Sequence, residues 1–223
     1  MRKIVISILA LLAVHSLHAQ CDNPYYSFDQ GSKWTMENYS AKGKKTGKVT
    51  SEITKLDKSG GGFNATIKST TYDKKDEMIL EGELDMQCES GVIRFDMRKF
   101  IPEETLKTLG GAEMEVVGDN LELPANLSVG EKLKDGSIRV NGDLPFNISV
   151  DITNRKVAAK ESVTTPAGTF ECYKITYDVK LKTVIGIQAK GAEWIARKVG
   201  IVKTESYNKN GKLTGYSVLS AHD

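Results

Sequence analysis

The chain has 223 residues, of which 39% are hydrophobic and 27% are charged, a balance typical of a folded globular protein rather than a disordered one. Lys and Arg number 31 against 29 Asp and Glu, and removing Arg2 and Lys3, which lie in an N-terminal leader, leaves 29 of each sign. This neutral balance argues against a nucleic-acid binder or a polybasic membrane-surface protein, which need a cationic excess. His15 and His18 also lie in the leader, so only His222 is left for histidine-based catalysis or metal binding.

The first 19 residues have the pattern of a secretory signal peptide. A basic start precedes an apolar run over residues 4–14, and Leu17 and Ala19 stand at the −3 and −1 positions of a cut after Ala19. The apolar run is shorter than the ~20 residues that a membrane-spanning helix needs. The sequence therefore predicts a signal peptide over 1–19 that is cleaved after Ala19.

Two alternatives to this cleavage remain open, namely a retained N-terminal anchor and a lipoprotein cut directly before Cys21. Lipoprotein signals require a small residue before the cysteine, whereas this chain has Gln20 there. We expect an exported protein, periplasmic or associated with the outer envelope. It would have one β-rich domain over 20–223 and no transmembrane segment in the mature chain.

The remaining cysteines, Cys21, Cys88 and Cys172, allow at most one internal disulfide if the compartment is oxidising. Alternation places Cys88 on the apolar side of a strand over 78–88, and it places Cys172 on the side opposite the apolar face of a strand over 170–182. A Cys21–Cys88 disulfide that holds the mature N-terminus is the preferred pair, and three free thiols are the alternative. No Cys-x-x-Cys occurs, so the sequence supports neither a redox motif nor a zinc knuckle.

Strands dominate the predicted elements. Apolar and polar residues alternate over 63–68, 78–88, 93–98, 146–153 and 170–182, as in strands that bury one face. Turn residues separate these runs, and the most specific turn signal is Asn210-Gly211, which is typical of a β-hairpin. Pro166-Ala-Gly168 predicts a second tight hairpin turn.

One short helix is expected near 102–109, where Pro102 and two acids open the segment and Gly110 ends it. About ten strands of this kind make a strongly curved sheet. The fold class is therefore all-β, with a single antiparallel, strongly curved sheet that is barrel-like or half-barrel-like. A sandwich is the alternative architecture.

The motifs that could carry chemistry are weak. Gly60-x-Gly62 with Ala65 fits a relaxed dinucleotide fingerprint, but a β-like run follows where a helix is needed, so a hairpin turn explains it better. A lysine-rich stretch over 42–48 is best explained as a solvated hairpin end. No Gly-x-Ser-x-Gly occurs, and no catalytic residue, metal ligand or cofactor is predicted.

Aromatic residues give one candidate for a ligand site. A rolled sheet with an apolar interior can hold an apolar ligand. Trp34, Trp194, Tyr173 and Tyr177 are the residues expected to line such a cavity. The alternative is that these aromatic side chains only fill the core.

Three segments together resemble a known family. They are 28–34 (Phe-Asp-Gln-Gly-Ser-Lys-Trp), 163–177 (with Thr-Pro-Ala-Gly-Thr-Phe) and 193–203 (with Trp-x-Ala-x-x-Val-Gly-x-Val-Lys). Their order is similar to that in exported proteins of Gram-negative bacteria grouped as TapB-like proteins and domain of unknown function 3108. The resemblance covers nearly the whole mature chain. It implies a mostly-β periplasmic or envelope domain, and it supplies no catalytic residues.

Two functions follow as hypotheses. The first is a β-barrel-like module that binds an apolar or amphipathic ligand, such as a lipid. The second is a non-enzymatic structural or interaction protein of an envelope complex. An enzyme that uses no histidine is a third reading, and clustered carboxylates or lysines with shifted pKa values in a cleft would favour it.

Overall fold

The structure is a computed structural model that describes residues 21, 23–26, 29–58, 61–100, 115–142, 148–183 and 186–223. The signal peptide predicted over 1–19 and the helix predicted near 102–109 lie outside these residues. The helical element within them is a short 3₁₀ helix, η1 (Met97–Phe100). None of the helices in the described part of the chain is long and apolar enough to cross a membrane.

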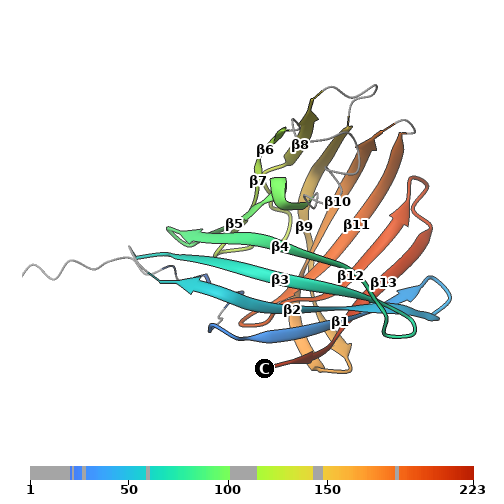
Figure 1. The fold of residues 1–223 in the computed structure, drawn as a ribbon, viewed down its shortest axis with the longest axis horizontal. Coiled ribbons are helices and arrows are strands. Elements are labelled where there is room, and N and C mark those ends of the chain that lie inside the picture. The colour runs from blue at the N-terminus through green and yellow to red at the C-terminus, as the bar shows by residue number, and fades with distance from the viewer. Residues whose placement is uncertain are drawn as a thin grey trace, which may run out of the picture.

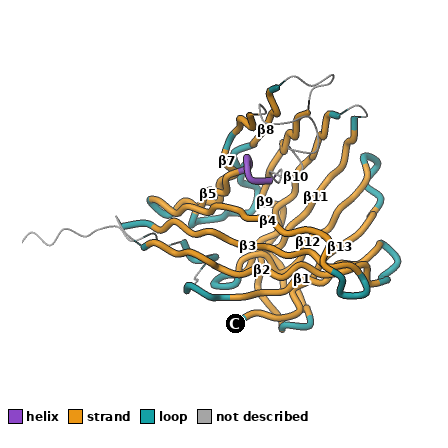
Figure 2. Tube along the Cα trace, viewed as in Figure 1, coloured by secondary structure: helices purple, strands orange, loops and turns teal. Residues whose placement is uncertain are grey.

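Thirteen strands within the described residues form one antiparallel sheet, as the alternation predicts (Figures 1 and 2). The strands are β1 (Lys33–Ser40), β2 (Lys45–Asp57), β3 (Phe63–Asp73), β4 (Met78–Glu89), β5 (Val92–Asp96), β6 (Glu115–Gly118), β7 (Asn120–Pro124), β8 (Gly136–Asn141), β9 (Ile148–Thr165), β10 (Gly168–Lys182), β11 (Ile187–Ala196), β12 (Gly200–Asn208) and β13 (Leu213–His222). Their order in the sheet is β6-β8-β9-β10-β11-β12-β13-β1-β2-β3-β4-β5-β7.

The sheet consists of two meanders joined side by side. Strands β1–β5 form one meander and β8–β13 the other, and the last strand pairs with the first, from Trp34 opposite His222 to Ser40 opposite Gly215. In Figure 1, β1–β4 run across the view while β9–β13 rise steeply behind them. The sheet therefore curves strongly and wraps into a nearly closed barrel, which confirms the predicted fold class.

The two edge strands of this sheet are consecutive in the sequence. β6 pairs with β8, Asp119 follows, and β7 pairs with β5 at the other edge. The Asp119 amide still donates to the carbonyl of Ser137, at 2.9 Å, before β7 turns away from β8. One short segment thus closes the barrel, and beyond Asp119 a seam opens between β7 and the chain that leads into β8.

The interior core confirms the alternation in several strands. Ala65 and Ile67 of β3 are buried, and so is Ile93 of β5. The apolar face expected over 78–88 is buried only in its second half. Met86 and Cys88 lie in the core, whereas Met78 and Leu80 are 65% and 43% exposed because β4 begins at a hairpin that extends beyond the barrel.

A second core lies on the opposite face of the sheet. It is formed by Cys172, Ala192, Trp194, Ala196, Val202 and Leu219. The β9–β10 hairpin curls over this face, so that the Ala167 amide at its tip donates to the carbonyl of Leu219 in β13 at 3.3 Å. The predicted Pro166-Ala-Gly168 turn is therefore the tip of a flap that buries the outer face of β11–β13.

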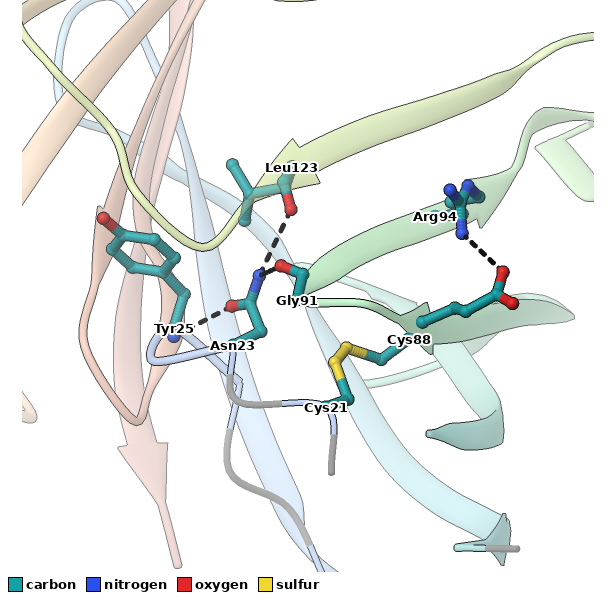
Figure 3. Close-up of a disulfide and its surroundings, with 8 residues drawn as sticks. Cys21, Asn23, Tyr25, Cys88, Gly91, Arg94 and Leu123 are labelled. Atoms are coloured by element: carbon teal, nitrogen blue, oxygen red, sulfur yellow. Dashed lines mark hydrogen bonds and ion pairs between the residues drawn. A yellow bond between two sulfur atoms is a disulfide. The ribbon is translucent and has the colours of Figure 1, made fainter. Parts of the chain in front are cut away.

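The N-terminal segment closes one end of the interior (Figure 3). A disulfide joins Cys21 to Cys88, the pair preferred from the sequence, with 5.7 Å between their Cα atoms. The Asn23 side-chain amide donates to the carbonyls of Gly91 and Leu123, at 3.0 and 3.2 Å. These anchors place Tyr25 and Tyr26 inside the barrel, where both are buried. We call residues 21 and 23–26 the N-terminal plug.

Glycine at position 200 makes room for this plug. Its φ of +82° lies in the left-handed region, and a Cβ atom there would stand 2.5 Å from Cε1 of Tyr26. The Lys198 amide also donates to the carbonyl of Pro24 at 2.8 Å. The turn between β11 and β12 is thus shaped to hold the plug.

The disulfide is expected to contribute strongly to stability. Its cysteines are 67 residues apart. For a loop of that length, removing the cross-link is expected to lower the unfolding free energy by about 4 kcal/mol, because the unfolded chain gains conformational entropy. We expect the Cys21→Ser, Cys88→Ser double variant to lose about this much unfolding free energy in urea denaturation. The matched control is Cys172→Ala, which removes a buried free thiol. A double variant no less stable than this control would contradict the prediction.

Candidate functional site

The aromatic residues selected from the sequence do not gather around one cavity. Tyr173 and Tyr177 pack against the interior core, whereas Trp194 belongs to the second core beneath the β9–β10 flap. Trp34 packs against both cores. Of the four, Tyr177 lines the interior pocket described next. The expectation of a shared aromatic cavity is therefore wrong, because the flap covers the face that carries Trp194.

Trp194 has a structural environment instead. Its indole Nε1 donates to Glu161 of β9 at 2.6 Å, and the Lys174 and Lys203 ammonium groups lie 4.6 and 4.5 Å from the centre of its ring. Only 3% of the residue is exposed. The bond to Glu161 joins β9 to β11, whereas Lys174 and Lys203 are the cross-strand neighbours of Trp194 within the sheet and stack on its ring there.

The interior pocket lies between the two meanders and has a volume of about 210 Å³. Its walls come from seven strands and the N-terminal plug. Three aromatic rings line it, those of Tyr26, Phe95 and Tyr177, and the first two meet edge to face with their centres 5.7 Å apart. The aliphatic lining residues are Leu84, Leu121, Leu123, Ile152, Ile195 and Ile201.

Three polar residues interrupt this apolar lining, namely Arg155 of β9, Tyr177 of β10 and Glu193 of β11. An apolar cavity with a few convergent polar groups is typical of a small-molecule site. The environment of each polar group therefore indicates what the pocket can bind.

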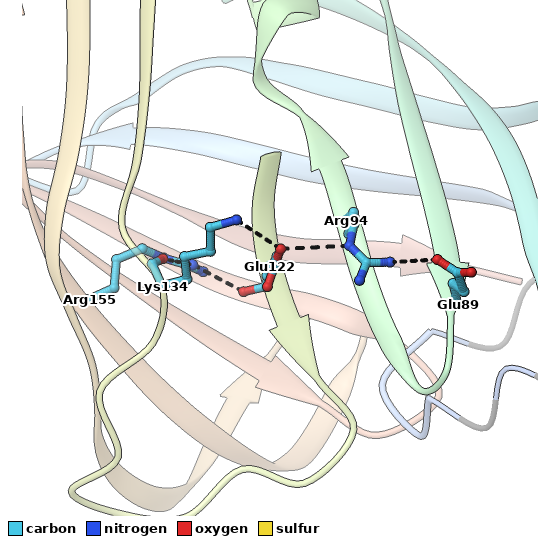
Figure 4. A network of polar contacts seen from close by, with 5 residues as sticks. All are labelled: Glu89, Arg94, Glu122, Lys134 and Arg155. Atoms are coloured by element: carbon cyan, nitrogen blue, oxygen red, sulfur yellow. Dashed lines mark hydrogen bonds and ion pairs between the residues drawn. The ribbon is translucent and has the colours of Figure 1, made fainter. Parts of the chain in front are cut away.

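Arg155 holds the seam of the barrel (Figure 4). Its Nη1 donates to the carbonyl of Glu122 in β7 at 3.0 Å and to that of Lys134, ahead of β8, at 2.7 Å. The guanidinium thus bridges the two chain segments that diverge after Asp119. The residue is only 5% exposed, and burial lowers the pKa of its guanidinium, which nevertheless stays protonated in proteins.

The carboxylate of Glu122 is engaged elsewhere (Figure 4). It pairs with the Lys134 ammonium at 3.0 Å and with Nε of Arg94 at 3.6 Å, and Arg94 also pairs with Glu89. None of the ion pairs among the described residues includes Arg155. Its charge is therefore left without a contacting carboxylate in this part of the chain.

Glu193 is the acidic member of the polar wall. Burial raises the pKa of its carboxyl above the ordinary 4.5, and the Arg155 charge opposes this effect. Tyr177 lies over Gly191, where a Cβ atom would overlap its ring. Burial and the nearby Glu193 together raise the pKa of the Tyr177 phenol. The pocket thus holds a cation and a carboxyl group that is harder to ionise than one in water.

Two other hollows are less suited to a ligand. A wider groove of about 590 Å³ crosses β2–β5, and four of its polar residues bind one another, Arg98 with Asp96 and Thr66 with Asp85. A cleft of about 440 Å³ lies beside Trp194 at the flap. Within the described residues, no group of three or more His, Cys, Asp or Glu side chains is arranged to hold a metal ion.

The chain is similar to known proteins both in sequence family and in fold. The DUF3108-like family matches residues 29–219 of this chain. A protein of Bacteroides fragilis, described as exported and as having a YmcC-like fold, is 24% identical, with a TM-score of 0.72 over 89% of this chain and 98% of its own. A protein of Parabacteroides distasonis, described as a lipoprotein, is 21% identical, with a TM-score of 0.74 over 90% and 99%. Comparison with curated proteins finds no significant match.

Replacing Glu193 is expected to stabilise the protein at high pH. A carboxyl whose pKa is raised in the folded state destabilises that state once it ionises, so wild-type stability should rise as pH falls through the folded pKa towards 4.5. We expect Glu193→Gln to be about 1–3 kcal/mol more stable than wild type at pH 8. The difference should vanish near pH 4.5.

Urea denaturation at several pH values would measure this difference. Glu83→Gln, at an exposed position of β4, is the matched control and should stay within about 0.5 kcal/mol of wild type. A Glu193→Gln variant that is less stable than wild type at pH 8 would show that the ionised carboxylate is well paired in the fold.

Proposed function

The chain belongs to the DUF3108-like family, and we propose that it is an exported envelope protein that binds a small apolar or amphipathic molecule inside its curved sheet. The observation that carries this proposal is the interior pocket. It combines an apolar lining with three polar groups, and both meanders and the N-terminal plug contribute to it.

Export is supported by three observations. The sequence begins with the pattern of a secretory signal, and the two structural relatives are described as an exported protein and a lipoprotein. Cys21 and Cys88 form a disulfide, which is typical of oxidising compartments outside the cytoplasm. The same disulfide occupies the sulfur of Cys21 that lipidation would need, so the cleaved, unlipidated form is favoured.

The pocket sets the size of the ligand. An apolar protein cavity of about 150 Å³ accommodates benzene, so a pocket of about 210 Å³ has room for one ring or a short alkyl chain. A whole lipid is larger than this space. The proposed ligand is therefore a small molecule, or the end of the chain of a larger one.

One surface feature favours the second candidate, an interaction protein of an envelope complex. Met78, Ile79 and Leu80 are consecutive in β4 and are 65%, 64% and 43% exposed. Consecutive exposed apolar residues on a soluble domain often mark a contact site. The comparisons indicate no enzymatic family for this chain.

Binding can be tested with hexan-1-ol, whose chain matches the pocket in size. Titration followed by NMR should shift the methyl resonances of Leu121, Ile152 and Ile201. Ile201→Trp should abolish the shifts because the larger ring fills the pocket. The matched control Ile187→Trp, at a residue that is 52% exposed, should bind as wild type does. Absence of shifts in the wild-type protein would contradict ligand binding in the pocket and would favour the second candidate, an interaction protein of an envelope complex.

Export and processing can be tested by the intact mass of protein recovered from the periplasm of an expression host. We expect the mass of residues 20–223 less two hydrogens, because one disulfide forms. A retained leader, or an added acyl mass with Cys21 at the N-terminus, would contradict cleavage after Ala19. Native spectra of the same sample would show any small molecule that co-purifies.

A further inference from the structure

The guanidinium of Arg155 presents hydrogen-bond donors that the protein itself does not use. An arginine side chain carries five N–H donors. Within the described residues, the Arg155 side chain makes two hydrogen bonds, both from Nη1, to the carbonyls of Glu122 and Lys134. The donors on Nε and Nη2 have no acceptor there, although the residue is only 5% exposed and lines the pocket.

A guanidinium that is 5% exposed and has no carboxylate in contact is unfavourable, because it has lost most of its water and gained no contacting counterion. The two carbonyls compensate for part of this loss and also fix the plane of the guanidinium. Its remaining edge is therefore preorganised, and a ligand that binds there does not have to order it. This is the geometry in which arginine recognises carboxylate and other planar or branched oxyanions.

We propose that the interior pocket selects a small amphiphile with an anionic head, a carboxylate or sulfonate that accepts hydrogen bonds from Arg155 while its alkyl or aryl part lies against Leu121, Ile152 and Ile201. This inference rests on the proposed function, since it names the ligand class of the same pocket. An uncharged apolar ligand would leave the Arg155 donors unpaired, so it should bind less tightly.

Glu193 couples this binding to pH. The charged and titratable groups that face it are Arg155 from β9, Tyr177 from β10 and Tyr26 from the N-terminal plug. When ionised, Glu193 balances the charge of Arg155 and repels an anion. When protonated, Glu193 no longer balances the charge of Arg155, so an anionic ligand can pair with that charge. Anion binding should therefore take up a proton at Glu193 and strengthen as pH falls.

The test compares three probes with the same six-carbon chain on the wild-type protein at pH 6, namely hexane-1-sulfonate, hexan-1-ol and hexylammonium. The sulfonate stays ionised across the whole pH range, so its own titration does not interfere. We expect hexane-1-sulfonate to bind at least about tenfold more tightly than the alcohol, and hexylammonium to bind most weakly. Dissociation constants would come from NMR titration.

The outcomes separate the two proposals. If the alcohol binds as tightly as the sulfonate, the pocket is a ligand site but the anionic class is wrong. Preference for hexylammonium would overturn the inference in the same way and assign the head group to Glu193. If none of the probes perturbs the pocket resonances, the proposed function itself fails.

Variants give an independent readout of the same inference. Between pH 8 and pH 5, wild-type affinity for hexane-1-sulfonate should increase several-fold, whereas Glu193→Gln should show the low-pH affinity throughout. Arg155→Met should lose the preference for sulfonate over alcohol. Because Arg155 also holds the seam, this variant is informative only where its NMR spectrum shows a native fold, and Glu193→Gln keeps the inference testable otherwise. A pH-independent wild type with unchanged affinity in Glu193→Gln would overturn the coupling.

Discussion

Closure of the sheet is the constraint on which the rest of the structure depends. A barrel removes exposed strand edges only if its first and last strands meet, and here both edges belong to one segment that bends at Asp119. The bend lets β6 complete the ladder with β8 but carries β7 away, which opens a seam that backbone hydrogen bonds do not close. Arg155 spans that seam through the carbonyls of Glu122 and Lys134. A buried cation inside a mostly apolar barrel is therefore a consequence of how the sheet closes, and the pocket forms next to it.

The other boundary of the pocket is set by covalent and polar anchors at the N-terminus. Without the Cys21–Cys88 disulfide and the hydrogen bonds of Asn23, the short segment ahead of β1 would have fewer contacts to offset the conformational entropy lost on ordering it. With them, Tyr26 enters the barrel and forms part of the pocket wall. The interior is thus filled by the plug at one end and bridged by Arg155 at the seam, and the space between these two features is the pocket.

Much of this fold could be predicted from the sequence, because period-two alternation and turn chemistry are local signals. The strand around 63–68 and the hairpin at Asn210-Gly211 form as predicted, whereas the strand predicted over 93–98 ends at Asp96, where the 3₁₀ helix η1 follows. The site could not be predicted in the same way. In β11, Ala192, Trp194 and Ala196 share one face while Gly191, Glu193 and Ile195 share the other, so the pattern alone does not place Glu193 inside the protein. In the structure both faces are covered, because the β9–β10 flap covers the Trp194 face while the curved sheet turns the Glu193 face towards the interior pocket, and alternation cannot reveal these long-range arrangements.

Strand β11 consequently contributes side chains to both cores. This arrangement helps to explain the position of its polar residues. Trp194 and Ala196 point into the second core, whereas Glu193 and Ile195 point into the pocket. A chain selected only to pack would gain stability from an apolar residue at position 193, since burying a carboxyl group is unfavourable and well-packed apolar replacements of buried charges are often neutral or stabilising. Arg155 has a structural use in the seam, but that use occupies only its Nη1. Among the described residues the Glu193 side chain forms no hydrogen bond or ion pair and interacts with Arg155 only through space, and groups retained at a cost to stability are characteristic of functional sites. The energetics of Glu193 and Arg155, as well as the shape of the pocket, therefore favour a ligand there.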